Sequence, residues 1–262
     1  MVYSVRHVVE FDRGEEWLKK TTTVTVILPV YNEEKCIVNT LKSVIQFAQV
    51  KPHYQFIFVD DGSSDRTPEI LQAEISSLKN LNICAFFNSD NRGKGYAVKT
   101  GVLQTNSEFI CFLDADLAYT LDYLDLIVAK LEKFDIVIGC RTLTPKWGNG
   151  FNFSRKLAGK IFNFISRQVL NLKFTDMQAG IKGFKKSAAR DLFKTQTMPG
   201  FGFDVELIYL AEKKGYSIEE IPVIVSSKHL YKESKVKLFK HSLEMLFNLI
   251  QIRSNDLFGK YD

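Results

Sequence analysis

The sequence predicts an α/β fold with a mostly parallel sheet and helices on both of its faces. From residue 24 onward, short runs of β-branched and aromatic residues alternate with longer helical patterns. The short runs are almost continuously apolar, as strands of a parallel sheet are when helices cover both faces. The chain has 262 residues and an average soluble composition, so it is long enough for one large domain or two small ones.

The first half of the chain supplies the predicted sheet in regular alternation. The predicted strands are Val24–Val30, Gln55–Val59, Asn82–Phe87, Phe109–Leu113 and Ile136–Gly139. The predicted helices are Glu34–Phe47, Pro68–Leu78, Gly95–Gln104 and Leu121–Lys133. The second helix has a clear start, with Thr67 as its N-cap and Pro68 in the first helical position. Ligands of such sheets bind beyond the carboxyl ends of the strands, so those ends are the first candidates for function.

The second half of the chain is less regular. Its predicted elements are two helices, a strand and a last helix, over Arg155–Leu170, Phe203–Lys214, Ile218–Val225 and Lys235–Ile252. Thr142–Phe153 is predicted to be a loop, and Thr175–Phe184 is a polar stretch that contains glycine. This part is therefore expected to form an irregular region beside the sheet that ends in a helix.

The last helix is amphipathic, with a broad apolar face flanked by basic residues. Such a helix packs on the domain or lies in a membrane interface, and both interpretations stay open here. The expected organisation has three parts: a polar extension over residues 1–22, an α/β domain over 23–226, and a basic loop with the amphipathic helix over 227–262.

Charge, cysteine content and hydropathy exclude several classes of protein. The net charge of +5 suits an anionic ligand or a lipid surface, and it is too small to indicate nucleic acid. The four cysteines lie far apart without a metal-binding spacing, which favours core residues in a reducing compartment. No signal peptide and no run of about 18 uncharged apolar residues is found. We therefore expect a cytoplasmic protein, peripheral on the cytoplasmic face of a membrane.

Acidic residues follow three of the predicted strands. They stand in Pro29-Val30-Tyr31-Asn32-Glu33, in Asp60-Asp61-Gly62-Ser63 and in Asp114-Ala115-Asp116. Carboxylates gathered at one edge repel one another unless a cation or hydrogen-bond donors intervene. Asp114 and Asp116 can supply oxygen ligands to Mg²⁺ or Mn²⁺, which typically bind one or two carboxylates together with phosphates. Such an ion would neutralise a departing diphosphate.

A glycine-rich segment, Asn91-Arg92-Gly93-Lys94-Gly95, opens the third predicted helix. Its glycines permit a close backbone approach, and the helix start offers N–H groups to an anion. The phosphate-binding pattern GxxxxGK[ST] and the dinucleotide pattern GxGxxG are both absent. A nucleotide hydrolase or a dinucleotide-dependent dehydrogenase is therefore not favoured.

Taken together, these motifs resemble the family 2 glycosyltransferases, which have the GT-A fold. The motifs that carry the resemblance are Pro29-x-Tyr31-Asn32-Glu33, Asp60-Asp61-Gly62-Ser63, Gly93-Lys94-Gly95 with Ala97 and Gly101, and Asp114-x-Asp116. Later motifs resemble the polyprenyl-phosphate sugar synthases, namely Gly139-x-Arg141, Thr175-Asp176-x-Gln178-x-Gly180-x-Lys182-x-Phe184, Phe203-Asp204-Val205-Glu206-Leu207 and Glu233-Ser234-Lys235. The resemblance covers about residues 23–255.

Within these synthases the sequence is more similar to the dolichyl-phosphate β-glucosyltransferases than to the mannose synthases. The stretches 203–207 and 234–253 carry this similarity. Ala118 stands where the mannose synthases have a glutamine metal ligand, and His229 stands where they have a nucleotide-binding arginine. The resemblance therefore favours UDP-glucose over GDP-mannose as the donor.

The resemblance also implies roles for individual residues. The nucleotide-sugar would be bound by Pro29, Tyr31, Asn32, Glu33, Asp60, Asp61, Lys94, Asp114 and Ala115. Mg²⁺ or Mn²⁺ would be held by Asp114 and Asp116, with Glu206 as the candidate for a further ligand. Phosphate charge on the donor or acceptor would be neutralised by Arg141, Arg155, Lys182 and Lys235. The catalytic set would comprise Asp114, Asp116, Asp176 and Asp204, although Asp176 could equally cap a turn.

The implied enzyme is a hexosyltransferase that transfers a hexose to a polyprenyl or dolichyl phosphate with inversion. A phosphate monoester is largely dianionic at pH 7, so as a nucleophile it needs little help from a base. The alternatives are a mannose synthase, a soluble transferase acting on a sugar hydroxyl, a catalytically inactive binding subunit and a nucleotidyltransferase. The expected partners are a nucleotide-sugar, a polyprenyl-phosphate lipid and a membrane surface, without nucleic acid. A membrane-anchor subunit or a homodimer stays open.

Overall fold

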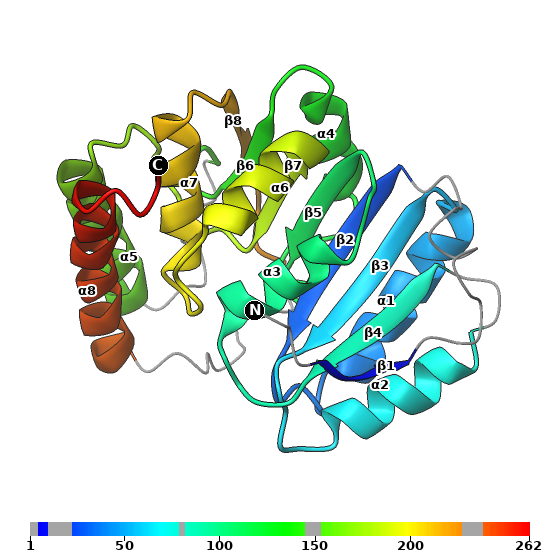
Figure 1. Cartoon of the computed structure of the whole chain (residues 1–262). Coiled ribbons are helices and arrows are strands. Elements are labelled where there is room, and N and C mark those ends of the chain that lie inside the picture. The colour runs from blue at the N-terminus through cyan, green and yellow to red at the C-terminus, as the bar shows by residue number, and fades with distance from the viewer. Residues whose placement is uncertain (1–4, 10–22, 79–81, 145–152, 227–237) are drawn as a thin grey trace.

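The computed structural model describes residues 5–9, 23–78, 82–144, 153–226 and 238–262 (Figure 1). Within these ranges eight strands form one sheet in the order β1-β4-β3-β2-β5-β7-β6-β8. Their bounds are β1 Val5–Val9, β2 Val24–Val30, β3 Tyr54–Asp60, β4 Ile83–Asn88, β5 Phe109–Leu113, β6 Ile136–Cys140, β7 Ile181–Lys185 and β8 Ile218–Pro222. Strands β4, β3, β2 and β5 are parallel, as are β6 and β8, whereas β1 and β7 pair antiparallel with their neighbours.

Helices cover both faces of the sheet. Their bounds are α1 Ile37–Val50, α2 Thr67–Ser76, α3 Lys94–Leu103, α4 Tyr123–Leu131, α5 Phe153–Leu170, α6 Lys186–Thr195, α7 Phe203–Lys213 and α8 Leu238–Leu257. The buried side chains of α1, α2 and α4 pack on one face, and those of α3, α6 and α7 pack on the other. Helices α5 and α8 lie side by side beyond α7 (Figure 1). The predicted fold class is confirmed.

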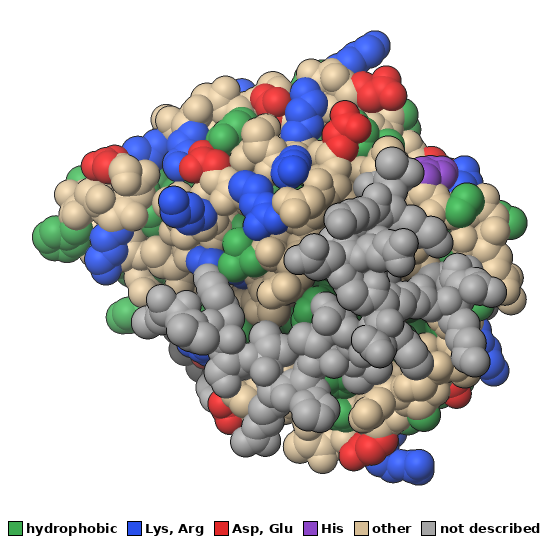
Figure 2. All heavy atoms as spheres, turned by 45° about the vertical axis from the view of Figure 1, so that its right-hand side comes forward, with side chains coloured by type: hydrophobic (Ala, Val, Ile, Leu, Met, Phe, Trp, Pro, Cys, Tyr) green, Lys and Arg blue, Asp and Glu red, His purple; other side chains and the backbone are tan. Residues whose placement is uncertain are grey.

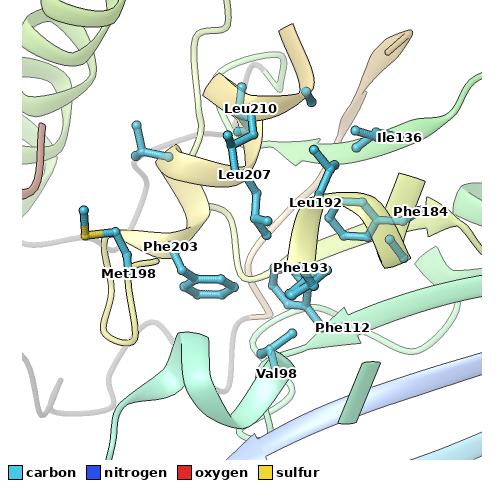
Figure 3. Close-up of a cluster of buried hydrophobic side chains, with 14 of the residues drawn as sticks. Val98, Phe112, Ile136, Phe184, Leu192, Phe193, Met198, Phe203, Leu207 and Leu210 are labelled. Carbon is cyan, nitrogen blue, oxygen red and sulfur yellow. The ribbon is translucent and has the colours of Figure 1, made fainter. Parts of the chain in front are cut away.

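The two cores follow from the alternation of side chains along each strand. In β3, Tyr54, Phe56 and Phe58 face the core under α1 and α2, whereas Ile57 and Val59 face the core under α3. In the second core, aromatic side chains from the sheet and the helices meet, with the Phe112 and Phe203 rings 5.5 Å apart between centroids (Figure 3). This core lies directly beneath the strand ends that carry the candidate site residues.

Three elements were not predicted from the sequence: β1, β7 and α6. Strand β1 lies inside the segment 1–22 that we expected to be a polar extension, and it pairs with β4 at the sheet edge. Strand β7 was interpreted as part of a polar stretch because its residues, Ile181 to Lys185, include glycine and two lysines. Gly183 is required there, since a Cβ atom would lie 2.3 Å from the Ile127 side chain of α4.

The predicted N-cap of α2 is also wrong. Thr67 is the first residue of the helix, and Arg66 precedes it without a side-chain capping bond. The Thr67 hydroxyl accepts the backbone N–H of Glu33 at 2.8 Å, and Asp65 accepts the N–H of Thr67. The threonine therefore ties the helix start to the loop after β2.

Candidate active site

The carboxyl ends of β2, β3 and β5 lie next to one another, as the predicted topology requires. Val30 at the end of β2 pairs with Asp60 at the end of β3, and β5 runs parallel on the other side of β2. The acidic segments after these strands therefore meet at one edge of the sheet. Figure 2 shows one face of the molecule, on which positive and negative side chains are interspersed among the described residues.

Asp114 lies at the centre of the candidate site. Its side chain is 34% exposed, and its Oδ1 atom lies 2.6 Å from the Nζ atom of Lys94, at the start of α3. Its backbone N–H donates to the Gly180 carbonyl at 3.0 Å. A Cβ atom on Gly180 would lie 1.8 Å from Asp114 Oδ2, so only glycine permits this approach. The contact brings the segment before β7 against the end of β5.

A buried charge network extends from Asp114 to α7. Lys94 lies 4.0 Å from Asp204, and Asp204 pairs with Lys182 at 2.6 Å. Lys182 is fully buried and also donates to the Ala179 carbonyl at 2.8 Å. Burial lowers the pKa of Lys182, and the adjacent Asp204 offsets this only in part. The prediction that Lys182 binds a phosphate is therefore wrong, because Asp204 and a carbonyl occupy its ammonium group.

Arg141 and Asp176 form a second ion pair at the end of β6. The Nε and Nη2 atoms of Arg141 each lie 2.7 Å from a carboxylate oxygen of Asp176, and the Arg141 backbone N–H donates to the same group. Burial alone would raise the pKa of Asp176, but the charge and hydrogen bonds of Arg141 outweigh burial and lower it. Asp176 is thus a buried positioning residue, and Arg141, 25% exposed, presents its charge at the site.

Asp60 and Asp61 differ in how their carboxylates are used. Asp61 accepts hydrogen bonds from Asn88 and from the backbone N–H groups of Arg92 and Gly93, so it holds the glycine turn. Asp60 accepts the Ser63 N–H on Oδ2, and its buried Oδ1 has no donor among the described residues. Burial raises the pKa of both groups. The geometry supports Asp60 as a ligand-binding residue and gives Asp61 a structural role.

The segment after β2 is held by its own side chains. Asn32 has a positive φ of 52°, and its Oδ1 accepts the N–H of Ser64 at 2.8 Å, so it shapes the loop. The Cys36 thiol donates to Glu33 at 2.7 Å. Tyr31 is 42% exposed at the edge of the site.

Two further residues that were predicted to bind the nucleotide-sugar are less open. The Ala115 carbonyl accepts the Thr40 hydroxyl at 2.6 Å and is turned to the α1 side. Pro29 is a half-buried residue of β2.

Glu206 does not join the two aspartates. Its Oε1 accepts the backbone N–H and hydroxyl of Thr197 and the hydroxyl of Tyr261, and its Oε2 accepts the N–H of Met198. Both oxygens are therefore used within a fully buried cluster. The prediction that Glu206 is a metal ligand is wrong, because the start of α7 directs its carboxylate to the loop before the helix.

The remaining carboxylates still fit a divalent cation. Asp114 and Asp116 supply hard oxygen atoms at the end of β5, and one Asp116 oxygen accepts the N–H of Ala118. Over the described ranges, no three His, Cys, Asp or Glu side chains gather as a complete metal site. Mg²⁺ needs only one or two carboxylates when phosphates and water fill its other positions. These two carboxylates are thus compatible with an ion that a phosphorylated ligand would share.

Two predicted residues have side chains outside the described part of the structure. Lys235, like His229, lies between residues 226 and 238, and the side chain of Arg155 at the start of α5 is not described.

Two residues at the site were given no role from the sequence. Tyr119 is buried near Arg141, whose charge acts on its hydroxyl, and Phe203 lies 5.7 Å from the Lys94 ammonium. Tyr119 belongs to none of the motifs named above, and Phe203 stands in one without an assigned role, so only their positions in space identify them as site residues.

Comparison with known proteins agrees with this arrangement. The model of the family described as Glycosyl transferase family 2 matches residues 25–193. The dolichyl-phosphate beta-glucosyltransferase of Dictyostelium discoideum is 31% identical over 249 residues, which cover 90% of this chain and 75% of that protein. The enzyme of the same name from Saccharomyces cerevisiae is 29% identical over 260 residues, which cover 91% and 76%.

Solved structures share the fold. Glucosyl-3-phosphoglycerate synthase of Mycobacterium tuberculosis, in complex with Mn²⁺, UDP and glucosyl-3-phosphoglycerate, has a TM-score of 0.61 at 18% identity, covering 90% of this chain and 82% of that one. The mannosyltransferase PcManGT of Pyrobaculum calidifontis, in complex with GDP-Man and Mn²⁺, has a TM-score of 0.54 at 17% identity, covering 92% and 79%. At these identities the likeness establishes the GT-A fold alone.

The fold and the edge of acidic strand ends define a glycosyltransferase of the GT-A type. The family match over most of the domain shows that the chain belongs to glycosyl transferase family 2. The family and the relatives named above confirm the prediction of a hexosyltransferase.

Proposed function

We propose that this enzyme transfers glucose from UDP-glucose to dolichyl phosphate or a related polyprenyl phosphate, with inversion and with a divalent cation. The observation that carries the proposal is the pair of Asp114 and Lys94 at the end of β5, beside the acidic ends of β2 and β3 and with Arg141 near the same buried Tyr119. The names of the curated relatives support the acceptor and the sugar. The UDP and Mn²⁺ complexes of the M. tuberculosis neighbour support the donor and the metal.

The contacts of Asp60, Lys94 and Arg141 suit each of them to bind a different part of the substrates. The buried Oδ1 of Asp60 can accept a hydrogen bond from the nucleobase or ribose. Lys94 and the start of α3 offer positive charge and N–H groups to the donor. Arg141 has three of its donors on Asp176, which fixes its plane, and its Nη1 edge can contact a phosphate of the donor or acceptor. The site therefore brings two anionic substrates together.

Asp114 and Asp116 would hold the cation on the donor diphosphate. When bound, the ion would act as a Lewis acid that stabilises the leaving nucleotide diphosphate. Lys94 pairs with Asp114 in the present arrangement, and we expect it to contact the same phosphates when the donor is bound. The acceptor phosphate is a dianion that attacks from the face opposite the leaving group, so a strong general base is not required.

The acceptor is a lipid, so we also propose that the enzyme docks on the cytoplasmic face of a membrane. None of the helices described by the structure is long and apolar enough to cross a bilayer. Helix α8 instead exposes Phe247 and Ile250, and the neighbouring α5 exposes Ile161 and Phe164. Leu246 of the same helix packs partly against the core, and the side chains of Phe239 and Leu243 are not among those that the structure describes.

The decisive experiment incubates the purified protein with Mg²⁺ or Mn²⁺, dolichyl phosphate and one nucleotide-sugar at a time. UDP-glucose, GDP-mannose and UDP-N-acetylglucosamine are compared by released nucleotide and labelled lipid. We expect transfer from UDP-glucose, a β-linked product by NMR, and loss of transfer in Asp116→Ala. Asp122→Ala is the matched control, because this exposed aspartate lies six residues further along the chain and should keep full activity.

The other outcomes separate the alternatives. Transfer from GDP-mannose alone would retain the reaction class and change the sugar. An α-linked product would exclude inversion. Binding of UDP without any lipid product would favour a soluble acceptor or a binding subunit.

A further inference from the structure

The C-terminal end of the chain reaches into the buried cluster around Glu206. Tyr261 is 1% exposed although it is the last residue but one, and its hydroxyl donates to Glu206 at 2.7 Å. Asn255 at the end of α8 donates to the Thr197 hydroxyl at 3.0 Å. Lys213 of α7 pairs with both Asp256 and Asp262, at 2.7 and 2.6 Å. The tail is therefore anchored by buried and surface contacts.

The same Glu206 carboxylate holds the loop that leads into α7. It accepts the backbone N–H groups of Thr197 at 2.9 Å and Met198 at 2.8 Å, together with the Thr197 hydroxyl. Hydrogen bonds to a buried carboxylate are stronger than neutral ones. The backbone position of Thr197 and Met198 thus depends on where Glu206 points, and Tyr261 is one of the donors that orient Glu206.

On its other side this loop supports the glycine turn at the start of α3. The Pro199 carbonyl accepts the Tyr96 N–H at 2.9 Å. Cβ atoms on Gly93 and Gly95 would lie 2.6 Å from the Pro199 oxygen and 2.8 Å from the Met198 oxygen. The two backbones are therefore in direct contact. Phe203, which follows the loop, lies above Val98 of α3 in the core (Figure 3). A shift of the loop would therefore move the turn and Lys94.

We propose that Tyr261 is a positioning residue for donor binding. Through Glu206 it fixes the loop 197–200, and this loop sets the place of the Gly93–Gly95 turn that carries Lys94. The inference rests on the proposed function, in which this turn contacts the nucleotide-sugar. It assigns the C-terminal tail, which none of the sequence motifs includes, a part in the affinity for the donor.

The test compares Tyr261→Phe with Tyr209→Phe. Tyr209 is the matched control, because its ring lies 6.3 Å from that of Tyr261 and its hydroxyl donates to Asp256 rather than to Glu206. UDP affinity with Mn²⁺ is measured by calorimetry, and amide exchange is followed in residues 93–98 and 196–202. We expect about three- to tenfold weaker UDP binding and faster exchange in both segments for Tyr261→Phe only.

A second variant, Asn255→Ala, removes the other tail contact to Thr197 and should change the same two readouts in the same direction. Equal UDP affinity and equal exchange in Tyr261→Phe and Tyr209→Phe would overturn the inference and leave Tyr261 a merely stabilising residue. Failure of the unaltered protein to bind UDP would contradict the proposed function, whereas the exchange of residues 93–98 would still decide whether the tail positions the turn.

Discussion

Asp114 and Gly180 show how one missing side chain shapes the candidate site. The carboxylate of Asp114 occupies the space that a Cβ atom of residue 180 would need. Lys94, at the start of α3, then pairs with Asp114. The position of the Asp114 carboxylate, which we propose as a metal ligand, thus depends on Gly180, a residue without a functional side chain.

We predict that Gly180→Ala lowers transfer activity by about 100-fold, because a displacement of about 1 Å can cost that much in a site of fixed geometry. The added methyl group would displace the end of the Asp114 side chain rather than backbone atoms, so the melting temperature should fall only slightly. Gly159→Ala is the control, since nothing lies within 4 Å of its Cβ position. Unchanged activity in Gly180→Ala would show that the position of Asp114 is not critical.

The ion pair between Asp176 and Arg141 should make the stability of the protein depend on pH. Its pKa is lowered in the folded protein, so its pairing with Arg141 stabilises the fold above the unfolded pKa of about 4 and is lost as the pH falls through the lower folded value. Asp176→Asn leaves Arg141 without its partner and should destabilise the protein by about 3 kcal/mol at pH 7. We expect this loss of unfolding free energy to be near the lower end of the range for buried ion pairs, because Arg141 is partly exposed.

Denaturant unfolding measured from pH 7 to pH 3 tests this prediction. The difference in unfolding free energy between the original protein and Asp176→Asn should shrink as the acid protonates Asp176. A difference that stays constant with pH would show that the ion pair does not contribute. Asp135→Asn serves as a comparison, since its carboxylate pairs with Lys185 near the surface.

At the scale of elements, α8 has two faces with different partners. Leu249 and Ile252 are buried against the domain, whereas Phe247 and Ile250 point outward with exposures of 72% and 61%. The interpretation that this helix packs on the domain is therefore confirmed, whereas its place in a membrane interface stays a prediction. It packs on the domain, and it leaves an apolar strip that we propose for the membrane.

We predict that Phe247→Ser with Ile250→Ser weakens binding to liposomes at least tenfold without lowering the melting temperature. Two apolar side chains would contribute about 1.5–3 kcal/mol each if fully buried in lipid. Cosedimentation with vesicles that contain anionic lipid measures the effect. The control is Val50→Ser, an exposed apolar residue at the end of α1. Equal loss of binding in the control, or none in the double variant, would exclude this surface.

At the scale of the whole molecule, β7 joins the two halves of the chain. It runs antiparallel between β5 and β6, so it links the parallel strands of the first half to the sheet edge of the second. The segment before it carries Asp176 and Gly180 to the ends of β6 and β5. Residues of the candidate site that are distant in the sequence meet because of this one strand.

Much of the fold could be predicted from local patterns. Continuous apolar runs identified β2 to β6 within about one residue at each end, because strands covered on both faces need apolar side chains throughout. The order of acids after β2, β3 and β5 likewise indicated where they would gather, because parallel strands place their carboxyl ends together. These features depend on periodicity and chain direction, which a sequence displays directly.

The use of each acid was decided only by the tertiary structure. Asp61, Asp204 and Glu206 look like ligands in the sequence, yet each accepts hydrogen bonds from backbone or pairs with a lysine in the fold. Asp60 keeps a buried oxygen without a donor among the described residues. A carboxylate in a motif is the same chemical group in either role, and the donors that reach it come from segments far away in the chain. The sequence therefore determined the sheet and the edge where the acids meet, and packing determined which of them can bind a substrate.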